Sequence, residues 1–173
     1  MNQILTFNQQ KAIKAISDKN QSKFNQLLTE TLNSDMVDLL GASFVTAMKN
    51  DPTAQRFVDI LEPKTFENCY NNLISHEGLR YVIAYLIYGR YIKSSHIFDT
   101  FTGMVQKNRS ESQTVSDGTL RGLQQEAKDI AVSQFKLIEQ YLQENSDTYP
   151  EWEKGSNRKH FKPRMINVRK TFK

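Results

Sequence analysis

The 173-residue chain contains one cysteine, one tryptophan and no long hydrophobic run. A lone thiol cannot form an internal disulfide, so no oxidising compartment is implied, and we interpret Cys69 as a small buried hydrophobe. The longest apolar stretch, 81–89, is far shorter than the roughly 20 residues that a membrane-spanning helix needs. The first residues lack the basic and apolar segments of a secretory signal. We therefore expect a soluble protein made in a cytoplasm.

Sequence motifs for catalysis and metal binding are also missing. The chain has no G-x-x-x-x-G-K-[ST] phosphate loop, no G-x-G-x-x-G and no H-E-x-x-H. None of the three histidines, His76, His96 and His160, has a second histidine or a cysteine at the spacing of metal ligands. We therefore expect no enzyme, no cofactor and no bound metal. A pocket with perturbed titratable groups would instead indicate a small enzyme with an unrecognised site.

The composition is poor in apolar residues and uneven in charge. Hydrophobic residues make up 38% of the chain and the mean hydropathy is −0.60, which favours a thin, elongated or assembled protein over a compact enzyme. The last twenty residues carry eight cations and no acid, so the remainder sums to −4 because the whole chain is +4. We predict a helical domain, 1–153, and a basic C-terminal tail, 154–173, with different partners for the two parts.

Apolar residues at helical spacing predict several short helices in the first half of the chain. The first seven residues look loose, and helices are expected at about 8–16, 22–33 and 44–50. A further short amphipathic helix is predicted after Pro63, because one face of a helix would collect Phe66, Cys69, Tyr70 and Leu73.

The segment 77–93 predicts a helix with two apolar faces. Its aliphatic stripe consists of Leu79, Val82, Ile83, Leu86 and Ile87, and its second stripe consists of Tyr81, Tyr85, Tyr88 and Ile92. A helix that is apolar on both sides must be buried on both sides. We favour a central core helix. An interface between subunits is the alternative for the tyrosine face, because tyrosine combines apolar area with a polar tip.

Residues 94–115 fit neither a helix nor a compact turn. Unstructured connections longer than about 12–15 residues are uncommon in compact domains and are usually functional or disordered. This one contains apolar residues and alternates between 100 and 107, which predicts an extended or β-hairpin arm. The arm either lies on the body as a long crossover or pairs with another subunit. The contact residues predicted for such pairing are Phe98, Phe101, Met104, Val105 and Val115.

A long amphipathic helix is predicted to follow the arm. Ser116 is a good N-cap, Asp117 suits the first turn, and Tyr149-Pro150 ends the pattern. About thirty helical residues span roughly 45 Å, which exceeds the diameter of a compact domain of this size. We therefore expect part of this helix to project or to line a wall between subunits.

The basic tail alternates cations with apolar residues. It is interpreted as a disordered solubilising end, as a contact for nucleic-acid phosphates, or as a segment that folds onto an acidic groove of a protein partner. The interleaved apolar residues favour the protein partner. The predicted partner-binding residues are Lys154, Arg158, Lys159, Phe161, Lys162, Arg164, Arg169, Lys170 and Phe172.

Several segments in a fixed order resemble a known group of proteins. They are Leu39-Leu40-Gly41, the aliphatic-tyrosine helix 79–92, the connector with Gly103-Met104-Val105-Gln106-Lys107-Asn108, Ser112 and Thr114-Val115-Ser116, and the long helix closing on Tyr141-Leu142 and Tyr149-Pro150-Glu151-Trp152. Together they resemble the head–tail connector (adaptor or ring) proteins of tailed bacteriophages that infect Bacteroides-type hosts, including crAss-like phages. The resemblance covers about residues 22–152, and the basic tail lies outside it.

The resemblance implies a mostly helical virion protein at the capsid–tail junction. Its subunits would form a homo-oligomeric ring, of twelve copies, below the portal protein. The ring would continue the channel for double-stranded DNA and offer a docking surface to a tail component or a second ring. The expected fold is an all-α helical bundle with a long extended or β-hairpin arm between the last two helices and an extended C-terminal tail. The alternative function is a phage DNA-binding or regulatory protein that uses the basic tail.

Overall fold

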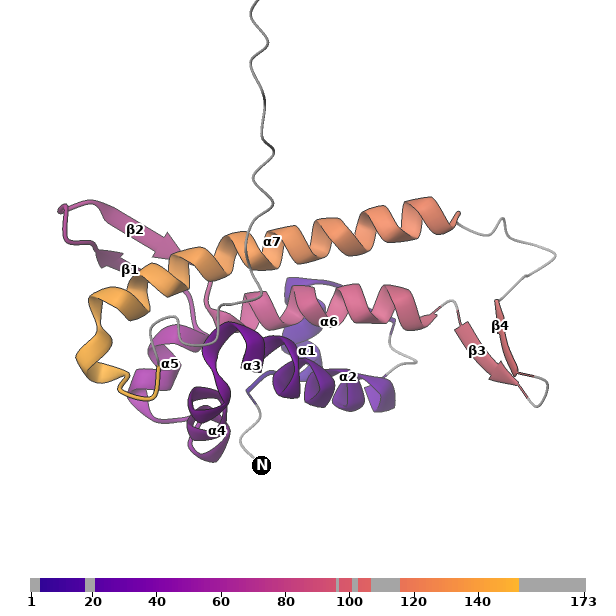
Figure 1. Cartoon of the computed structure of the whole chain (residues 1–173), viewed down its shortest axis with the longest axis horizontal. Helices are drawn as coiled ribbons and strands as arrows, with labels where there is room; N and C mark the ends of the chain where they lie inside the picture. Colours follow the sequence, from indigo (N-terminus) through magenta and orange to yellow (C-terminus); the bar gives the residue numbers. More distant parts are fainter. Residues whose placement is uncertain (1–3, 18–20, 96, 101–102, 107–115, 153–173) are drawn as a thin grey trace, which may run out of the picture.

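The computed structural model describes residues 4–17, 21–95, 97–100, 103–106 and 116–152, and its fold is mostly helical with small β-hairpins (Figure 1). The elements in chain order are α1 (Phe7–Ile13), α2 (Gln21–Asn33), α3 (Asp35–Leu40), α4 (Ala42–Asn50), α5 (Gln55–Leu61), β1 (Lys64–Glu67), β2 (Leu73–His76), α6 (Leu79–Ser95), β3 (Ile97–Thr100), β4 (Gly103–Gln106), α7 (Asp117–Glu144) and the 3-10 turn η2 (Ser146–Thr148).

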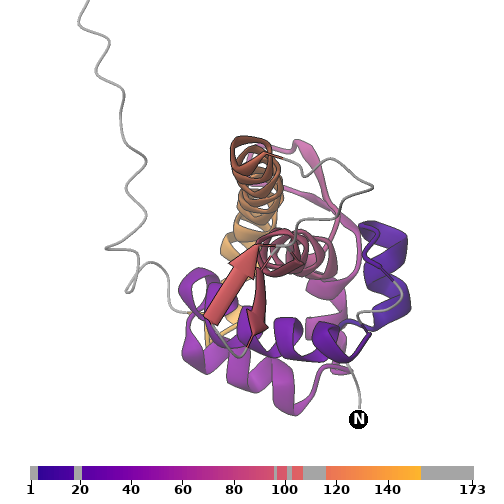
Figure 2. The same ribbon diagram turned by 90° about the vertical axis from the view of Figure 1, so that its right-hand side faces the viewer.

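The antiparallel pair of α6 and α7 forms the long axis of the molecule (Figure 1). The predicted core position of α6 is confirmed, because α1, α2 and α7 surround it and Val82, Ile83 and Ile87 are fully buried (Figure 2). Gly89 lies at the crossing of the two helices, where a Cβ would be in ordinary van der Waals contact with Gln124 and Ala127 of α7. In the tyrosine stripe, Tyr85 and Tyr88 are half-buried and pack against the core, and Ile92 is buried.

The start of the chain is more ordered than its sequence indicates. Residues 4–5 were expected to be loose, but Ile4 and Leu5 are buried in the core. Thr6 begins α1 with a capping box, in which its hydroxyl accepts from the Gln9 amide and the Gln9 side chain accepts from the Thr6 amide. The prediction missed this because two consecutive apolar residues carry no helical period.

The helix predicted around Phe66 and Leu73 is wrong, because this segment forms an antiparallel hairpin. β1 and β2 pair Phe66 with Ile74 and Glu67 with Leu73. The turn depends on Asn68, whose side-chain oxygen accepts from the amides of residues 70 and 72, both at 3.0 Å, while Asn71 takes a positive φ of 59°. Cys69 lies in this turn and is exposed, so its predicted burial is also wrong.

The arm prediction is partly tested between α6 and α7. β3 and β4 pair antiparallel there, and the hairpin extends the α6–α7 pair beyond its end (Figure 1). Of the predicted contact residues, Phe98 lies in β3 and Met104 and Val105 lie in β4, but their side chains are not described. Phe101 and Val115 lie outside the described residues.

The long helix begins and ends close to where the sequence predicts. The hydroxyl of Ser116 accepts from the Thr119 amide at 3.2 Å, which confirms the N-cap. The 28 residues of α7 correspond to about 42 Å. After η2 the chain folds back, so that Tyr149 and Trp152 are buried in the core beside α4 and α5.

Candidate interaction surfaces

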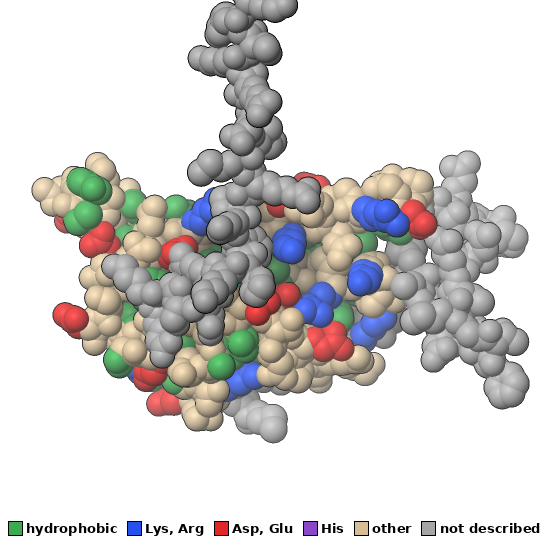
Figure 3. Space-filling view, viewed as in Figure 1, with side chains coloured by type: hydrophobic (Ala, Val, Ile, Leu, Met, Phe, Trp, Pro, Cys, Tyr) green, Lys and Arg blue, Asp and Glu red, His purple; other side chains and the backbone are tan. Residues whose placement is uncertain are grey.

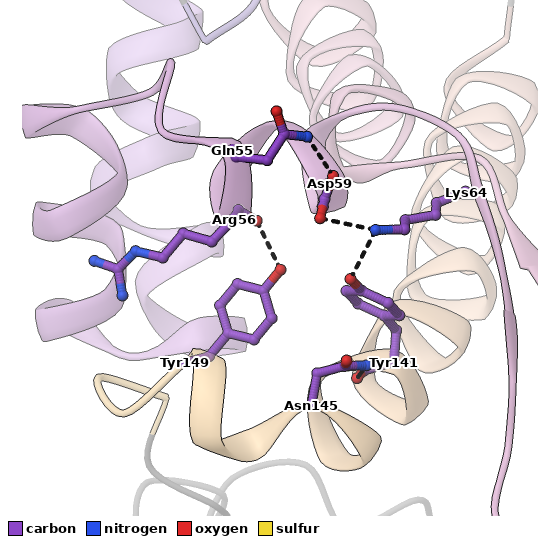
Figure 4. Close-up of polar contacts among 7 residues, drawn as sticks. All are labelled: Gln55, Arg56, Asp59, Lys64, Tyr141, Asn145 and Tyr149. Atoms are coloured by element: carbon purple, nitrogen blue, oxygen red, sulfur yellow. Dashed lines mark hydrogen bonds and ion pairs between the residues drawn. The ribbon is translucent and has the colours of Figure 1, made fainter.

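A polar network joins β1 to the C-terminal end of α7 (Figure 4). The Lys64 ammonium lies 2.7 Å from the Asp59 carboxylate and donates to the Tyr141 hydroxyl at 3.2 Å. The hydrogen-bonded Lys64 lowers the pKa of Asp59, and Asp59 raises the pKa of Lys64. Gln55 donates a second hydrogen bond to Asp59 at 2.8 Å. The network therefore fixes the base of the β1–β2 hairpin against α5 and α7.

A second set of contacts anchors the segment after α7. The Tyr149 hydroxyl donates to the Arg56 carbonyl oxygen at 2.6 Å, and burial raises the pKa of this phenol well above its usual range (Figure 4). The Arg56 guanidinium binds the Glu151 carboxylate through two hydrogen bonds of 2.8 Å. This pairing raises the pKa of Arg56 and lowers that of Glu151. These contacts fasten residues 149–151 to α5, next to buried Trp152.

The outer side of the β1–β2 hairpin forms an exposed surface with an apolar centre. Alternation places Phe66 and His76 against Tyr141 and turns Thr65, Glu67, Leu73 and Ser75 outward. Leu73 is 78% exposed and Tyr70, in the turn, is 80% exposed. We call these five residues, Thr65, Glu67, Tyr70, Leu73 and Ser75, the hairpin face; the apolar atoms of the hairpin are seen in Figure 3. Large exposed apolar side chains gathered on one face are typical of a contact surface.

A shallow hollow separates the hairpin turn from α7. Its volume is about 410 Å³, and its lining includes Cys69, Tyr141 and Glu144. The Cys69 amide donates to the Glu144 carboxylate at 3.2 Å, which ties the turn to the helix. Within the described ranges, no group of three or more His, Cys, Asp or Glu side chains is placed to hold a metal ion. No helix of this described part is long and apolar enough to cross a membrane.

The other end of the long axis carries a different surface. We call it the α6–α7 tip, which consists of residues 89–95 of α6 and 117–123 of α7. Leu123 is 39% exposed there, and Lys93 and Arg121 are exposed. A hollow of about 670 Å³ begins at Gly122 and follows α7 past Ile130. The first turns of α7 are thus largely exposed.

The exposed apolar surfaces of the described structure do not coincide with the partner-binding residues that the sequence predicts. All of the predicted tail residues, from Lys154 to Phe172, lie outside the described residues. The hairpin face was missed, because its apolar residues were assigned to a helix. Asn68 and the following Asn71-Asn72 are the signal that could have found it, since asparagine favours turns and positive φ.

Comparison with known proteins places the chain in a family. Residues 36–162 match the profile described as "Family of unknown function (DUF6712)". The chain belongs to this family. The match runs from α3 through α7 and the anchored segment at Tyr149 and Trp152, so it includes both the hairpin face and the α6–α7 tip. No curated protein and no solved structure matches the chain significantly.

Proposed function

We propose that this protein is a virion structural protein of a tailed bacteriophage. Its subunits form a ring below the portal, join the capsid to the tail and continue the channel for double-stranded DNA. The support comes from several segments between residues 22 and 152 that follow one another in the same order as in head–tail connector proteins, which they resemble. The portal and a downstream tail or ring protein are the proposed partners, and twelve is the proposed number of subunits.

The two-ended shape of the subunit is the observation that carries this proposal. The α6–α7 tip continues into the β3–β4 hairpin at one end, and the hairpin face lies at the other (Figure 1). A closed ring needs a heterologous interface, in which two different surfaces of one subunit meet. A subunit with different contact surfaces at its two ends meets that requirement.

We assign one side of the ring interface to the arm, residues 94–115. Replacing 96–115 by a short Gly-Ser linker should leave α6 and α7 paired, because their contacts lie within the helices. The expected product is a folded monomer by circular dichroism and light scattering. Rings that persist after this deletion would refute the assignment.

The basic tail is assigned to docking on the portal or an adjacent ring by coupled folding and binding. The segment that precedes the tail in sequence is anchored to α5 by the contacts of Tyr149 and Glu151 with Arg56. Truncation after Lys154 should abolish co-purification with the portal while self-association survives. Unchanged portal binding would exclude this role.

The eight cations of the tail favour one alternative, a DNA-binding or regulatory protein. This function predicts that the isolated monomer binds duplex DNA with an affinity that falls steeply with salt. The connector predicts self-association without such binding, so titration of labelled duplex at two salt concentrations separates the two functions.

A further inference from the structure

The two ends of the subunit differ in charge. At the hairpin end Glu67 and Glu144 are exposed and take part in no ion pair with another described residue, whereas Arg56 and Lys64 are each paired with a carboxylate. At the α6–α7 tip Lys93 and Arg121 are exposed and likewise form no ion pair with a described residue.

Figure 3 shows the same asymmetry on one face of the molecule. Acidic atoms gather towards the end that carries β1 and β2, and basic atoms gather over the half where α6 ends and α7 begins. Lys23 adds a third cation near the tip, where its ammonium donates to the Ser94 carbonyl oxygen at 3.0 Å. Asp117, in the first turn of α7, is an acid within the tip. The subunit is therefore polarised along its long axis.

Exposed apolar side chains follow the same division. In the described part of the chain, the large hydrophobic residues that are exposed are Tyr70 and Leu73 on the hairpin face and Leu123 at the tip. The hollow that begins at Gly122, the residue before Leu123, has room for an aromatic ring, because nothing lies within 4 Å of a Cβ added at Gly122. Further along α7 its lining includes Ile130 and the acids Glu126 and Asp129. Each end therefore combines exposed apolar area with charges that form no ion pair among the described residues, Glu67 and Glu144 at the hairpin end and Lys93 and Arg121 at the tip.

We propose that the hairpin face of one copy packs on the α6–α7 tip of the next copy. Tyr70 and Leu73 cover Leu123 and the hollow at Gly122, while Glu67 and Glu144 lie opposite Lys93 and Arg121. This contact rests on the proposed ring function. It makes the hairpin face the surface that receives the α6–α7 tip of the neighbouring subunit.

The occupant is a second copy because the complementary surface belongs to this same chain. The two ends are separated by most of α7, a helix about 42 Å long. One molecule therefore cannot bring its own ends together. A two-fold contact of like ends would place acid opposite acid or base opposite base, which costs free energy. The proposed ring needs a heterologous interface, so we take this contact of unlike ends as head-to-tail, and its repetition gives a ring if the rotation closes.

Truncating the apolar centre is the first test. The variant Tyr70→Ser/Leu73→Ser changes exposed side chains, so its far-UV circular dichroism should match the wild type. We expect its assemblies to dissociate to monomers at concentrations where the wild type remains assembled, by size-exclusion chromatography with light scattering. The control variant Asp38→Lys changes an exposed side chain on α3, away from both surfaces, and should assemble normally. Unchanged assembly of the serine variant would overturn the proposal.

Charge reversal gives a sharper test because it can be rescued. The acid-end variant Glu67→Lys/Glu144→Lys and the base-end variant Lys93→Glu/Arg121→Glu should each fail to assemble alone. A mixture should assemble, since every contact in an alternating ring then joins opposite charges. Failure of the mixture while both variants remain folded would overturn the charge pairing.

Disulfide trapping locates the contact directly. Cys69 is exposed in the hairpin turn, so Leu123→Cys places a second thiol on the opposing surface. Mild oxidation should give a ladder of covalent oligomers on a non-reducing gel. The control Asp38→Cys has the same number of thiols and should give no ladder above dimer. Equal ladders in both variants would overturn the proposal.

The outcomes separate this inference from the ring function. If the wild type and all hairpin and tip variants assemble, the proposed contact is wrong but the ring function still stands. If the variants fail to assemble and the wild type forms open filaments, the proposed contact is supported and the closed ring is wrong. A wild type that remains monomeric at every concentration overturns both.

Discussion

Acidification should destabilise the fold through His76. The imidazole is 1% exposed and packs against the rings of Phe66, in a tilted arrangement, and Tyr141, edge to face, with ring centroids 6.2 and 5.4 Å away. Its Nδ1 accepts from the Gly78 amide at 3.1 Å, and its Nε2 has no hydrogen-bond partner among the described residues. Protonating Nδ1 would remove that acceptor and bury a charge. Burial, helped by the nearby Lys64 ammonium, lowers the pKa of His76.

The sign and size of the effect follow from linkage. The unfolded chain takes up a proton as the pH falls through about 6.5, whereas the folded chain does not until its lower pKa is reached. The contribution of neutral His76 to the free energy of unfolding is therefore fully present above about pH 6.5 and falls by up to about 1.4 kcal/mol per pH unit below it. Between pH 7.5 and 5 the loss amounts to as much as about 2 kcal/mol.

Urea unfolding followed by circular dichroism at pH 7.5, 6 and 5 measures this slope. His76→Gln keeps a polar side chain that does not titrate, so its free energy of unfolding should be lower at pH 7.5 but flatter with pH. His160→Gln removes a different histidine and should retain the wild-type slope. If His76→Gln and the wild type lose the same free energy between pH 7.5 and 5, the buried neutral imidazole is not the cause.

Three further predictions test the parts that position the surfaces. Gly78→Ala should destabilise by about 2–5 kcal/mol in urea unfolding, because φ is +82° and a Cβ would lie 2.4 Å from the Leu61 carbonyl oxygen; a loss below about 1 kcal/mol would contradict that geometry. Tyr149→Phe should cost about 1–2 kcal/mol in thermal unfolding through the lost hydrogen bond to Arg56, and an unchanged Tm would contradict the anchor. The hydrogen bond with Tyr85 raises the pKa of the Tyr81 phenol to about 12, so Tyr81 should titrate late in ultraviolet absorbance. Its contribution to stability is lost as the pH rises from 10 to about 12. An unchanged titration curve in Tyr81→Phe would contradict the late titration of Tyr81.

The parts of the fold that were predictable carry long periodic patterns. α6 and α7 repeat apolar residues over many turns, and the cap at Ser116 is local chemistry that a sequence displays directly. The aliphatic stripe of α6 was placed in the core for the same reason.

The hairpin face was not predictable from periodicity alone. Residues 66, 69, 70 and 73 fit helical spacing, yet the same residues form a hairpin once Asn68 closes the turn and Phe66 packs against Tyr141. That packing joins residues far apart in sequence, so tertiary contact overrides the local pattern. Leu73 and Tyr70, which a helix would have buried, are instead the most exposed large apolar residues of the described chain.

The self-contacts of the C-terminal segment also escaped the sequence. Tyr149-Pro150 was interpreted only as the end of the long helix. In the structure Tyr149 also contacts Phe44 of α4, Tyr149 and Glu151 bind Arg56 of α5, and Trp152 is buried in the core. Such docking depends on the Arg56 guanidinium and carbonyl meeting partners more than ninety residues away, for which a single sequence has no signal.

The central claim is that this chain works by assembling with copies of itself. Negative-stain electron microscopy of the purified full chain, over a series of concentrations, tests it most directly. We expect closed rings of uniform diameter with an open centre. Single elongated particles at every concentration, together with steeply salt-dependent binding to duplex DNA, would contradict it.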